Sequence, residues 1–600
     1  MTHTSISAEE KSKPKIIVGM GTCGIAAGAR EVKTALEEAI KKAGLKWEVG
    51  ITGCAGMCYR EVLVDVTATG RKVTYGDMTT GRASKIVEAL IKGEFKDEWI
   101  VRDSKKKMPD DKFRERQVRI ILENCGEIDP ENIDDYIARG GYRALEKVLK
   151  KMKPAEIAQT VMDSGLRGRG GAGFSTGMKW KLAQESPGDE KYIICNADEG
   201  DPGAFMDRSV LEGDPHRVLE GMAIGAFTIG AREGYVYCRA EYPLAIARLK
   251  TAISQAEKRG FLGENIIGTG VDFHLHIKEG AGAFVCGEET ALMASIEGHR
   301  GMPRIRPPFP AESGLWGKPT NINNVETFAA IAWIINNGAD KFKAVGVEKS
   351  TGTKVFALTG KVKRSGLIEV PMGTPLKDIV FDIAGGIRDD GKAKAVQIGG
   401  PSGGCIPATM LETPIDYESL AGAGAIVGSG GMVVMDETSC MVDVAKYFLK
   451  FIKNESCGKC VPCRLGTKRM HEILIKISDG KGKMEDLEKL ERLARDVKAA
   501  SLCGLGQTAS NPVMSTIRYF REEYEDHIRK GICKAGVCQA LLTRFQIKPK
   551  ACKSCGICAR VCPSGAISGS KGKPYHIDQA KCIKCGLCQK ECPFDAIYKS

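Results

Sequence analysis

Closely spaced cysteines constrain the fold of this 600-residue chain more than any other feature, and the sequence holds 23 of them. Residues 552–563 read CKSCGICARVCP and residues 582–593 read CIKCGLCQKECP, so the pattern C-x2-C-x2-C-x3-C-P occurs twice. Three thiolates at this spacing hold one [4Fe–4S] cluster, and the fourth cysteine of each run ligates the cluster of the other run. The predicted ligand sets are Cys552, Cys555, Cys558 and Cys592 for one cluster, and Cys562, Cys582, Cys585 and Cys588 for the other. Zinc is the alternative, but two complete repeats of this pattern favour iron.

The C-terminal segment with these two runs resembles a bacterial two-cluster ferredoxin domain over about 50 residues. A third triplet lies upstream, in ESCGKCVPCRLG at residues 455–466. Residues 467–497 place leucines, isoleucines and charges at helical spacing, and Cys503 follows in SLCGLG. We therefore expect a helical hairpin that returns a fourth thiolate to a [4Fe–4S] cluster, with zinc as the alternative metal. The predicted ligands are Cys457, Cys460, Cys463 and Cys503.

A glycine-rich, basic stretch, GLRGRGGAGFSTGMKW, spans residues 165–180. Glycines let the backbone turn tightly and approach a ligand, and free N–H groups with nearby cations bind anions. The stretch alone fits a phosphate seat and a flexible basic surface loop equally well.

Three further motifs accompany this loop: CNADEGDPGAFMDR at 195–208, GAGAFVCGEETALMASIEG at 280–298 and RIRPPFPAESGLWGKPTNINNVET at 304–327. In this order they resemble the flavoprotein subunit of respiratory complex I, the NADH-oxidising subunit that carries FMN, over residues 110–525. The additions at both ends resemble the beta subunit of cytoplasmic multimeric [FeFe]-hydrogenases, many of which are electron-bifurcating and NAD(P)-dependent.

The resemblance implies a set of cofactor contacts. The loop over the FMN and NAD phosphates is matched by Gly168, Arg169, Gly170 and Gly171. Contacts to FMN and its phosphate are matched by Lys179, Asn196, Asp198, Glu199, Asn323, Asn324 and Thr327. Aromatic contacts to the dinucleotide are matched by Phe174 and Phe309. Flavin and nicotinamide contacts are matched by Gly287, Glu288 and Glu289. The two glutamates are the predicted catalytic pair, and their carboxylates would hydrogen-bond ribose hydroxyls or the nicotinamide amide. A solvated helix start is the alternative for that pair.

Two positions depart from the family pattern. Asp201 stands where a glutamate is usual, and Arg306 stands where a lysine is common. A shorter acid and a nearby arginine ease entry of a 2′-phosphate, because arginine pairs bidentately with phosphate. Both NAD(H) and NADP(H) therefore remain candidate coenzymes.

Residues 16–105 resemble a thioredoxin-like [2Fe–2S] ferredoxin domain. Cys54 and Cys58 fit the second cysteine pair of that family, whereas Gly19 and Gly24 align with the first pair and Cys23 lies nearby. Either Cys23, Cys54 and Cys58 hold a cluster with an unusual fourth ligand, or the cluster is lost. We expect the cluster, because three cysteines survive.

A second metal pattern precedes the ferredoxin segment. His527, Cys533 and Cys538 suit a zinc site that stiffens a hinge, and an ordinary histidine with two cysteines is the alternative. The remaining cysteines are expected to be core residues: Cys125, Cys195, Cys238, Cys286, Cys405 and Cys440.

The predicted fold class is multidomain α/β, with a Rossmann-like FMN/NAD domain at its centre. The expected boundaries are a disordered tail (1–15), the thioredoxin-like domain (16–105), the FMN/NAD(H) domain (106–345), a ubiquitin-like β-grasp (SLBB) insert (346–435), a helical bundle with [4Fe–4S] (436–528), a linker with the zinc residues (529–548) and the 2[4Fe–4S] domain (549–600). We see no chemistry in the insert.

The expected function is an NAD(P)H-oxidising or NAD(P)+-reducing diaphorase subunit of an electron-bifurcating hydrogenase. Its implied partners are an [FeFe]-hydrogenase catalytic subunit, a small [2Fe–2S] gamma subunit resembling the complex I 24-kDa protein, and ferredoxin, in a cytoplasmic hetero-oligomer with dimerisation left open. The alternatives are a formate dehydrogenase or transhydrogenase subunit, and an electron-transfer adaptor without nucleotide binding. The net charge of +13 suits anionic cofactors and acidic protein partners. The sequence has no basic run interleaved with aromatic residues, so nucleic acid is not expected as a partner. It has no apolar run of about 18 residues, so no membrane span is expected.

Overall fold

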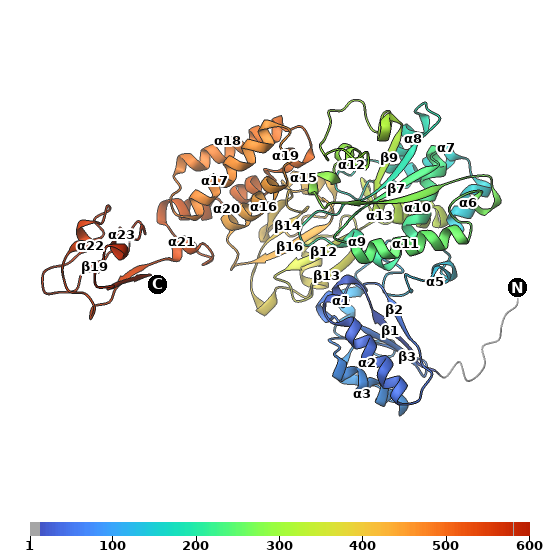
Figure 1. Cartoon of the computed structure of the whole chain (residues 1–600), viewed down its shortest axis with the longest axis horizontal. Coiled ribbons are helices and arrows are strands. Elements are labelled where there is room, and N and C mark those ends of the chain that lie inside the picture. The colour runs from blue at the N-terminus through green and yellow to red at the C-terminus, as the bar shows by residue number, and fades with distance from the viewer. Residues whose placement is uncertain (1–12, 580, 600) are drawn as a thin grey trace.

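The computed structural model describes residues 13–579 and 581–599. Figure 1 shows a central body, an N-terminal domain that projects from it, and a small C-terminal domain at the far end of a helical bundle. The tail expected at 1–15 lies mostly outside the described residues. In the described part of the chain, no helix is both long and apolar enough to cross a membrane.

The N-terminal domain is a five-stranded sheet in the order β2-β1-β3-β4-β5. Its strands are β1 (Lys15–Gly19), β2 (Val49–Thr52), β3 (Val64–Ala68), β4 (Arg71–Tyr75) and β5 (Ile100–Asp103). Helices α2 (Ala29–Lys42) and α3 (Thr80–Ile91) pack against each other. Val32, Leu36 and Ile40 recur at four-residue spacing on α2 and are buried, so this face packs on the sheet.

The central domain holds a parallel four-stranded sheet in the order β8-β7-β6-β9. The strands are β6 (Tyr192–Ala197), β7 (Glu233–Arg239), β8 (His274–Gly280) and β9 (Thr320–Asn324). Helices α10 (Pro215–Ile229), α11 (Pro243–Lys258) and α13 (Val325–Asn337) cover it. From β6 the chain proceeds to β7 and β8 on one side, whereas β9 returns on the other. Such a reversal opens a crevice at the carboxyl ends of the strands, where ligands bind.

The insert forms a second sheet in the order β13-β12-β16-β14-β15. Its strands are β12 (Thr353–Gly360), β13 (Gly366–Pro371), β14 (Ala393–Ile398), β15 (Gly404–Pro407) and β16 (Gly431–Asp436), with the short helix α15 (Tyr417–Gly422). Lys354 at the start of β12 is fully buried and forms an ion pair with Glu326 of α13, which joins the insert to the central domain.

The helical bundle follows the insert. It contains α16 (Met441–Glu455), α17 (Thr467–Ser478), α18 (Met484–Ala500), α19 (Gly504–Thr508) and α20 (Asn511–Glu525). Helices α17 and α18 form the hairpin expected from the sequence, and Cys503 follows it as the N-cap of α19.

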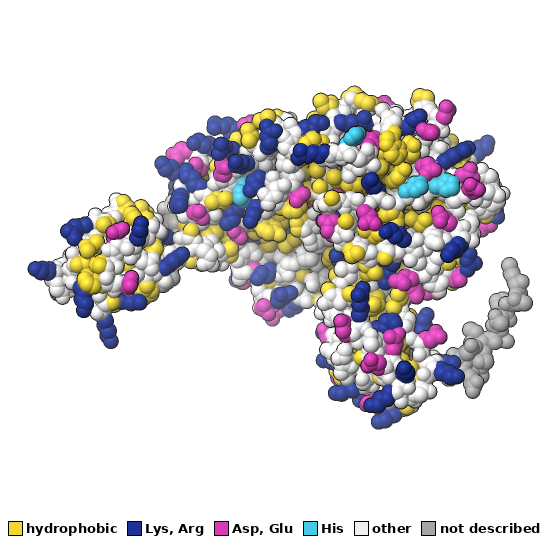
Figure 2. Space-filling model, viewed as in Figure 1, with side chains coloured by type: hydrophobic (Ala, Val, Ile, Leu, Met, Phe, Trp, Pro, Cys, Tyr) yellow, Lys and Arg dark blue, Asp and Glu magenta, His cyan; other side chains and the backbone are white. Residues whose placement is uncertain are grey.

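The C-terminal domain has two short helices and two small sheets. Its elements are β17 (Phe545–Ile547), α22 (Ile557–Arg560), β18 (Ile567–Ser568), β19 (His576–Ile577), α23 (Leu587–Lys590) and β20 (Ile597–Lys599). Its small core consists of the side chains of Phe545, Ile567, Ile577 and Ile597 with the cysteines. Figure 2 shows lysine and arginine side chains distributed over its visible face.

Candidate functional site

A cavity of about 640 Å³ lies where the central domain, the insert and the bundle meet. Its size is within the range of small-molecule and cofactor sites. It opens at the carboxyl ends of β6 and β9, at the reversal of strand order. Its lining includes Gly170, Gly171, Asn196, Asp198, Glu288 and Asn324 of the central domain, Tyr417 and Ser429 of the insert, and Leu505 of the bundle.

The glycine-rich loop forms one wall of this cavity. Gly171 has a φ of +129°, and a Cβ at Gly170 would stand 3.1 Å from Asn324 Cβ, so side chains here would fill the space. The Arg169 side chain is 1% exposed and donates to the carbonyls of Thr351 and Thr353 in the insert. Arg169 thus belongs to the loop, but its charge faces the insert rather than the cavity.

Asn323, Asn324 and Thr327 lie at the end of β9 and the start of α13. Thr327 Oγ1 accepts from the Arg169 backbone N–H at 2.9 Å, and Asn323 Oδ1 accepts from Trp180 Nε1 at 2.9 Å. Of these three predicted phosphate contacts, only Asn324 lines the cavity. The other two hold the loop and the adjoining helix α8 (Thr176–Glu185) in place.

Two residues of the NADE motif, Asn196 and Asp198, line the cavity. Asn196 donates to the Gly287 carbonyl at 2.9 Å, which fixes the two walls relative to each other. Both carboxylate oxygens of Asp198 are buried without a partner in the described residues, and burial raises the pKa of Asp198 to about 7. A buried polar group of this kind is costly unless a ligand satisfies it.

The other acids of this motif are engaged by the protein. Glu199 accepts from the backbone N–H groups of Met206 and Asp207, so it caps α9 (Met206–Gly213). Asp201 accepts from the Ser429 hydroxyl of the insert, and burial raises its pKa to about 6. Both residues still line the cavity.

The two predicted catalytic glutamates differ. Glu288 is the N-cap of α12 (Glu289–Ile296), where one oxygen accepts from the backbone of Thr290 and Ala291 at 3.0 Å. The helix-start alternative therefore describes Glu288, although its side chain also lines the cavity. Glu289 lies between two cations, in ion pairs with Lys179 and, at 3.6 Å, with Arg306.

Phe174 and Phe309 remain exposed by 55% and 52%, respectively. Arg306 lies over the Phe309 ring, 6.0 Å from its centroid. Apolar rings that the fold leaves in solvent suit contact with a planar ligand such as a base.

The sequence analysis missed the contribution of the insert. The Tyr417 hydroxyl donates to the Gly168 carbonyl at 2.9 Å, and Arg167 lies 4.0 Å above the Tyr417 ring while pairing with Glu418. Tyr417 and Glu418 belong to α15, and no motif marked these two residues. The only signal was the glycine content of residues 422–431, which lets the backbone line the cavity.

Each predicted [4Fe–4S] ligand set surrounds a small cavity of its own. One cavity is lined by Cys457, Cys460, Cys463 and Cys503. Two more, in the C-terminal domain, are lined by Cys552, Cys555, Cys558 and Cys592, and by Cys562, Cys582, Cys585 and Cys588. The structure thus brings the predicted sets together, including the exchange of the fourth cysteine. Cys555 and Cys585 are exposed.

The N-terminal cysteines also converge. The Cys58 thiol contacts those of Cys23 and Cys54, and Arg208 of α9 donates to Cys23 at 3.5 Å. Three thiols and a cation from the central domain therefore meet at the interface of the two domains.

The zinc pattern gains a fourth member. The ligand atoms of Cys440, His527, Cys533 and Cys538 all lie within 4.8 Å of one another, and all four residues are buried. Cys440 is buried as expected, but its assignment as an isolated core residue is wrong, since it lies 3.5 Å from His527 Nε2. Three thiols and one imidazole are a ligand combination found in structural zinc sites.

Comparison with known proteins agrees with this arrangement. Family models match at residues 161–333 (Nuo51 FMN-binding domain), 355–405 (SLBB domain), 443–527 (NADH-ubiquinone oxidoreductase-F iron-sulfur binding region) and 529–596 (4Fe-4S dicluster domain). An NADP-reducing hydrogenase subunit HndC of Solidesulfovibrio fructosivorans is 59% identical over 77% of this chain and 93% of its own. A component of the NADH-quinone oxidoreductase of Aquifex aeolicus is 43% identical over 70% and 96%. An NAD+-reducing [NiFe]-hydrogenase crystal structure has a TM-score of 0.62 and 32% identity, covering 86% of this chain and 84% of the other.

The fold, the cavity and these matches define a class of protein, the FMN-binding iron–sulfur oxidoreductase subunits. Within that class, the chain belongs to the family of the complex I 51-kDa flavoprotein, together with its hydrogenase relatives.

Proposed function

We propose that this chain exchanges hydride with NAD(P)H at FMN and passes single electrons to partners as the diaphorase subunit of a hydrogenase complex. One observation carries the proposal. Val285 and Leu505 line both the large cavity and the cavity of Cys457, Cys460, Cys463 and Cys503. A flavin in the large cavity would therefore be separated from a cluster by single side chains.

The large cavity fits FMN, because glycines leave room along the loop and Asp198 presents a buried carboxyl without a protein partner among the described residues. FMN supplies the conversion between two-electron and one-electron transfer. The chain's part would be positioning: the loop and Asn324 would hold the phosphate end, while Asp198 and Glu288 would orient the polar edge of the ring system. Glu289, held by Lys179 and Arg306, orients the nicotinamide half of the coenzyme.

The site supports NADPH as well as NADH. Asp201 is a shorter acid than the usual glutamate and accepts from the Ser429 hydroxyl, so its carboxylate is engaged by the insert rather than extended towards a 2′-phosphate. The Arg306 side chain is 40% exposed and lies over the Phe309 ring, so its guanidinium could pair with that phosphate. The name of the HndC relative, an NADP-reducing hydrogenase subunit, agrees with this interpretation.

The C-terminal domain serves as the exit for electrons. Residues 549–600 carry nine lysines and arginines against three aspartates and glutamates. This basic surface and the exposed Cys555 and Cys585 suit an acidic ferredoxin as electron partner. Further partners are an [FeFe]-hydrogenase catalytic subunit and a small [2Fe–2S] gamma subunit in a cytoplasmic complex, and the two cluster routes permit electron bifurcation.

Zinc at Cys440, His527, Cys533 and Cys538 would tie the end of the bundle to the linker that leads to this domain. Such a site would hold the start of the linker to the C-terminal domain firmly against the bundle.

The test is mass spectrometry of the complex purified under anaerobic conditions, combined with hydrogen evolution assays with NADH, NADPH and reduced ferredoxin. We expect a hydrogenase subunit and hydrogen evolution that depends on pyridine nucleotide. Copurification of a formate dehydrogenase, or activity only as a transhydrogenase, would reassign the complex. A protein whose flavin does not respond to either nucleotide would be an adaptor.

A further inference from the structure

The N-terminal cysteine site lacks a fourth thiolate. Cys23 lies at the start of α1 (Thr22–Ala26), while Cys54 and Cys58 lie on the facing loop after β2. The Cys58 thiol contacts both of the others. Gly19 and Gly24 stand where the resemblance to a thioredoxin-like ferredoxin implies the first cysteine pair. A complete site needs one more donor close to these two glycines.

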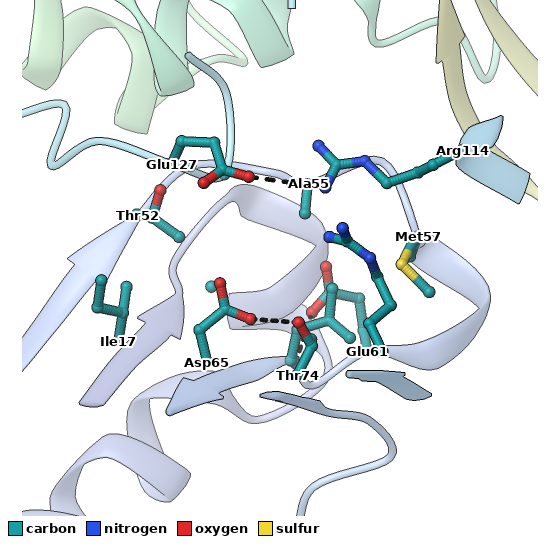
Figure 3. A pocket seen from close by; sticks show the side chains of 14 residues that line it. Ile17, Thr52, Ala55, Met57, Glu61, Asp65, Thr74, Arg114 and Glu127 are labelled. Carbon is teal, nitrogen blue, oxygen red and sulfur yellow. Dashed lines mark hydrogen bonds and ion pairs between the residues drawn. The ribbon is translucent and has the colours of Figure 1, made fainter. Parts of the chain in front are cut away.

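A carboxylate occupies that place. Glu61 Oε2 lies 3.1 Å from where a Cβ at residue 24 would stand and 3.9 Å from where one at residue 19 would stand. The same oxygen accepts from the Leu63 backbone N–H at 3.2 Å, which fixes the side chain. Figure 3 shows Glu61 among the residues that line a small cavity between the sheet and the central domain. The carboxylate therefore lies beside Gly24 and Gly19, the two positions where a thiolate is missing.

The surroundings suit a bound electron carrier. Thr22 donates its backbone N–H to Glu212 at 2.8 Å, and a side chain at Gly53 would clash with Gly213, so the cysteine loops are held against α9. Asp207 lines the large cavity, and its neighbour Arg208 donates to Cys23. Adjacent Cα atoms are about 3.8 Å apart. One turn of α9 thus connects the cysteine site with the cavity assigned to FMN.

We propose that Glu61 is the fourth ligand of a [2Fe–2S] cluster held by Cys23, Cys54 and Cys58. The inference rests on the proposed N-terminal cluster and names its missing donor. Carboxylate oxygen is an accepted iron ligand, harder than thiolate, and it favours the ferric state.

The experiment uses the full chain, purified anaerobically and reconstituted with iron and sulfide. Iron and acid-labile sulfide are measured per FMN, and the reduced protein is examined by electron paramagnetic resonance. We expect about fourteen iron atoms per FMN in the unaltered protein, and about twelve after Glu61→Ala, with loss of one [2Fe–2S] signal. The matched control is Asp65→Asn, since Asp65 lines the same cavity but accepts from Thr74 at 2.6 Å. It should keep about fourteen.

A second variant tests the position as well as the residue. A Cβ at Gly19 meets nothing closer than 3.6 Å, whereas one at Gly24 would lie 2.5 Å from the Gly19 carbonyl oxygen. Gly19→Cys combined with Glu61→Ala should therefore restore about fourteen iron atoms, with a resonance signal altered by the fourth thiolate.

Two results would overturn the proposal: about twelve iron atoms in the unaltered protein, or about fourteen with an unchanged signal after Glu61→Ala. The FMN content of each variant reports whether the chain has folded. Failure of the proposed function would show differently, as a flavin in the unaltered protein that NADH and NADPH do not reduce.

Discussion

Replacement of Lys354 by methionine tests how the insert is joined to the flavin domain. Lys354 and Glu326 are 0% and 1% exposed as side chains, and the ammonium also donates to the Val355 carbonyl at 2.9 Å. Lys354→Met leaves the Glu326 carboxylate buried without its cation. Removing one partner of a buried pair costs about 3–5 kcal/mol, because the remaining charge is desolvated and uncompensated.

The assay is urea unfolding of the flavin-free protein, followed by tryptophan fluorescence, with the free energy of unfolding taken from the transition that contains the buried Trp180. The matched control is Lys363→Met, which breaks an exposed, solvent-screened pair with Asp390 and should leave the free energy of unfolding nearly unchanged. The double variant Lys354→Met with Glu326→Leu should recover most of the loss, since neither charge of the pair is left buried without its partner. Equal costs for Lys354→Met and Lys363→Met would refute the reasoning.

Three further predictions concern the site. Burial raises the pKa of Asp198 to about 7, so between about pH 4 and 7 the folded protein holds a proton that the unfolded chain has lost, and the free energy of unfolding falls as pH rises. Asp198→Asn should reduce this pH dependence in urea unfolding of the flavin-free protein. An unchanged dependence of the free energy of unfolding on pH would contradict the assignment to Asp198. Glu289→Ala should lower kcat/KM for NADH by about 10- to 100-fold while FMN stays bound, whereas joint loss of FMN would show that the residue serves the flavin. Cys440→Ala should remove about one zinc ion per chain by metal analysis, and unchanged zinc would place the ion elsewhere.

The iron–sulfur sites were predictable because their chemistry is local. Thiolate spacing fixes three corners of a cluster, and even Cys503 could be placed, since the helical pattern of α17 and α18 predicts a hairpin that returns it. The site at the carboxyl ends of β6 and β9 was predicted from short motifs that contain the lining residues themselves.

Contacts between distant segments were not predictable in the same way. The Arg169 side chain donates to the carbonyls of Thr351 and Thr353, about 180 residues further along the chain. The residues next to Arg169 in the sequence do not indicate this contact, so its charge was predicted to face the phosphates. Cys440 precedes His527 by 87 residues without any cysteine spacing to mark it. The insert lines the cavity through residues such as Tyr417, Glu418 and Ser429, which no sequence motif marks.

The central claim is that a pyridine nucleotide reduces a flavin that lies one side chain from an iron–sulfur cluster. The most direct test is an anaerobic titration of the reconstituted protein with NADH and NADPH, followed by absorbance. We expect the flavin absorbance band at about 450 nm to bleach and the clusters to be reduced in the same titration. A protein that holds no flavin after reconstitution, or a flavin that neither nucleotide bleaches, would contradict it.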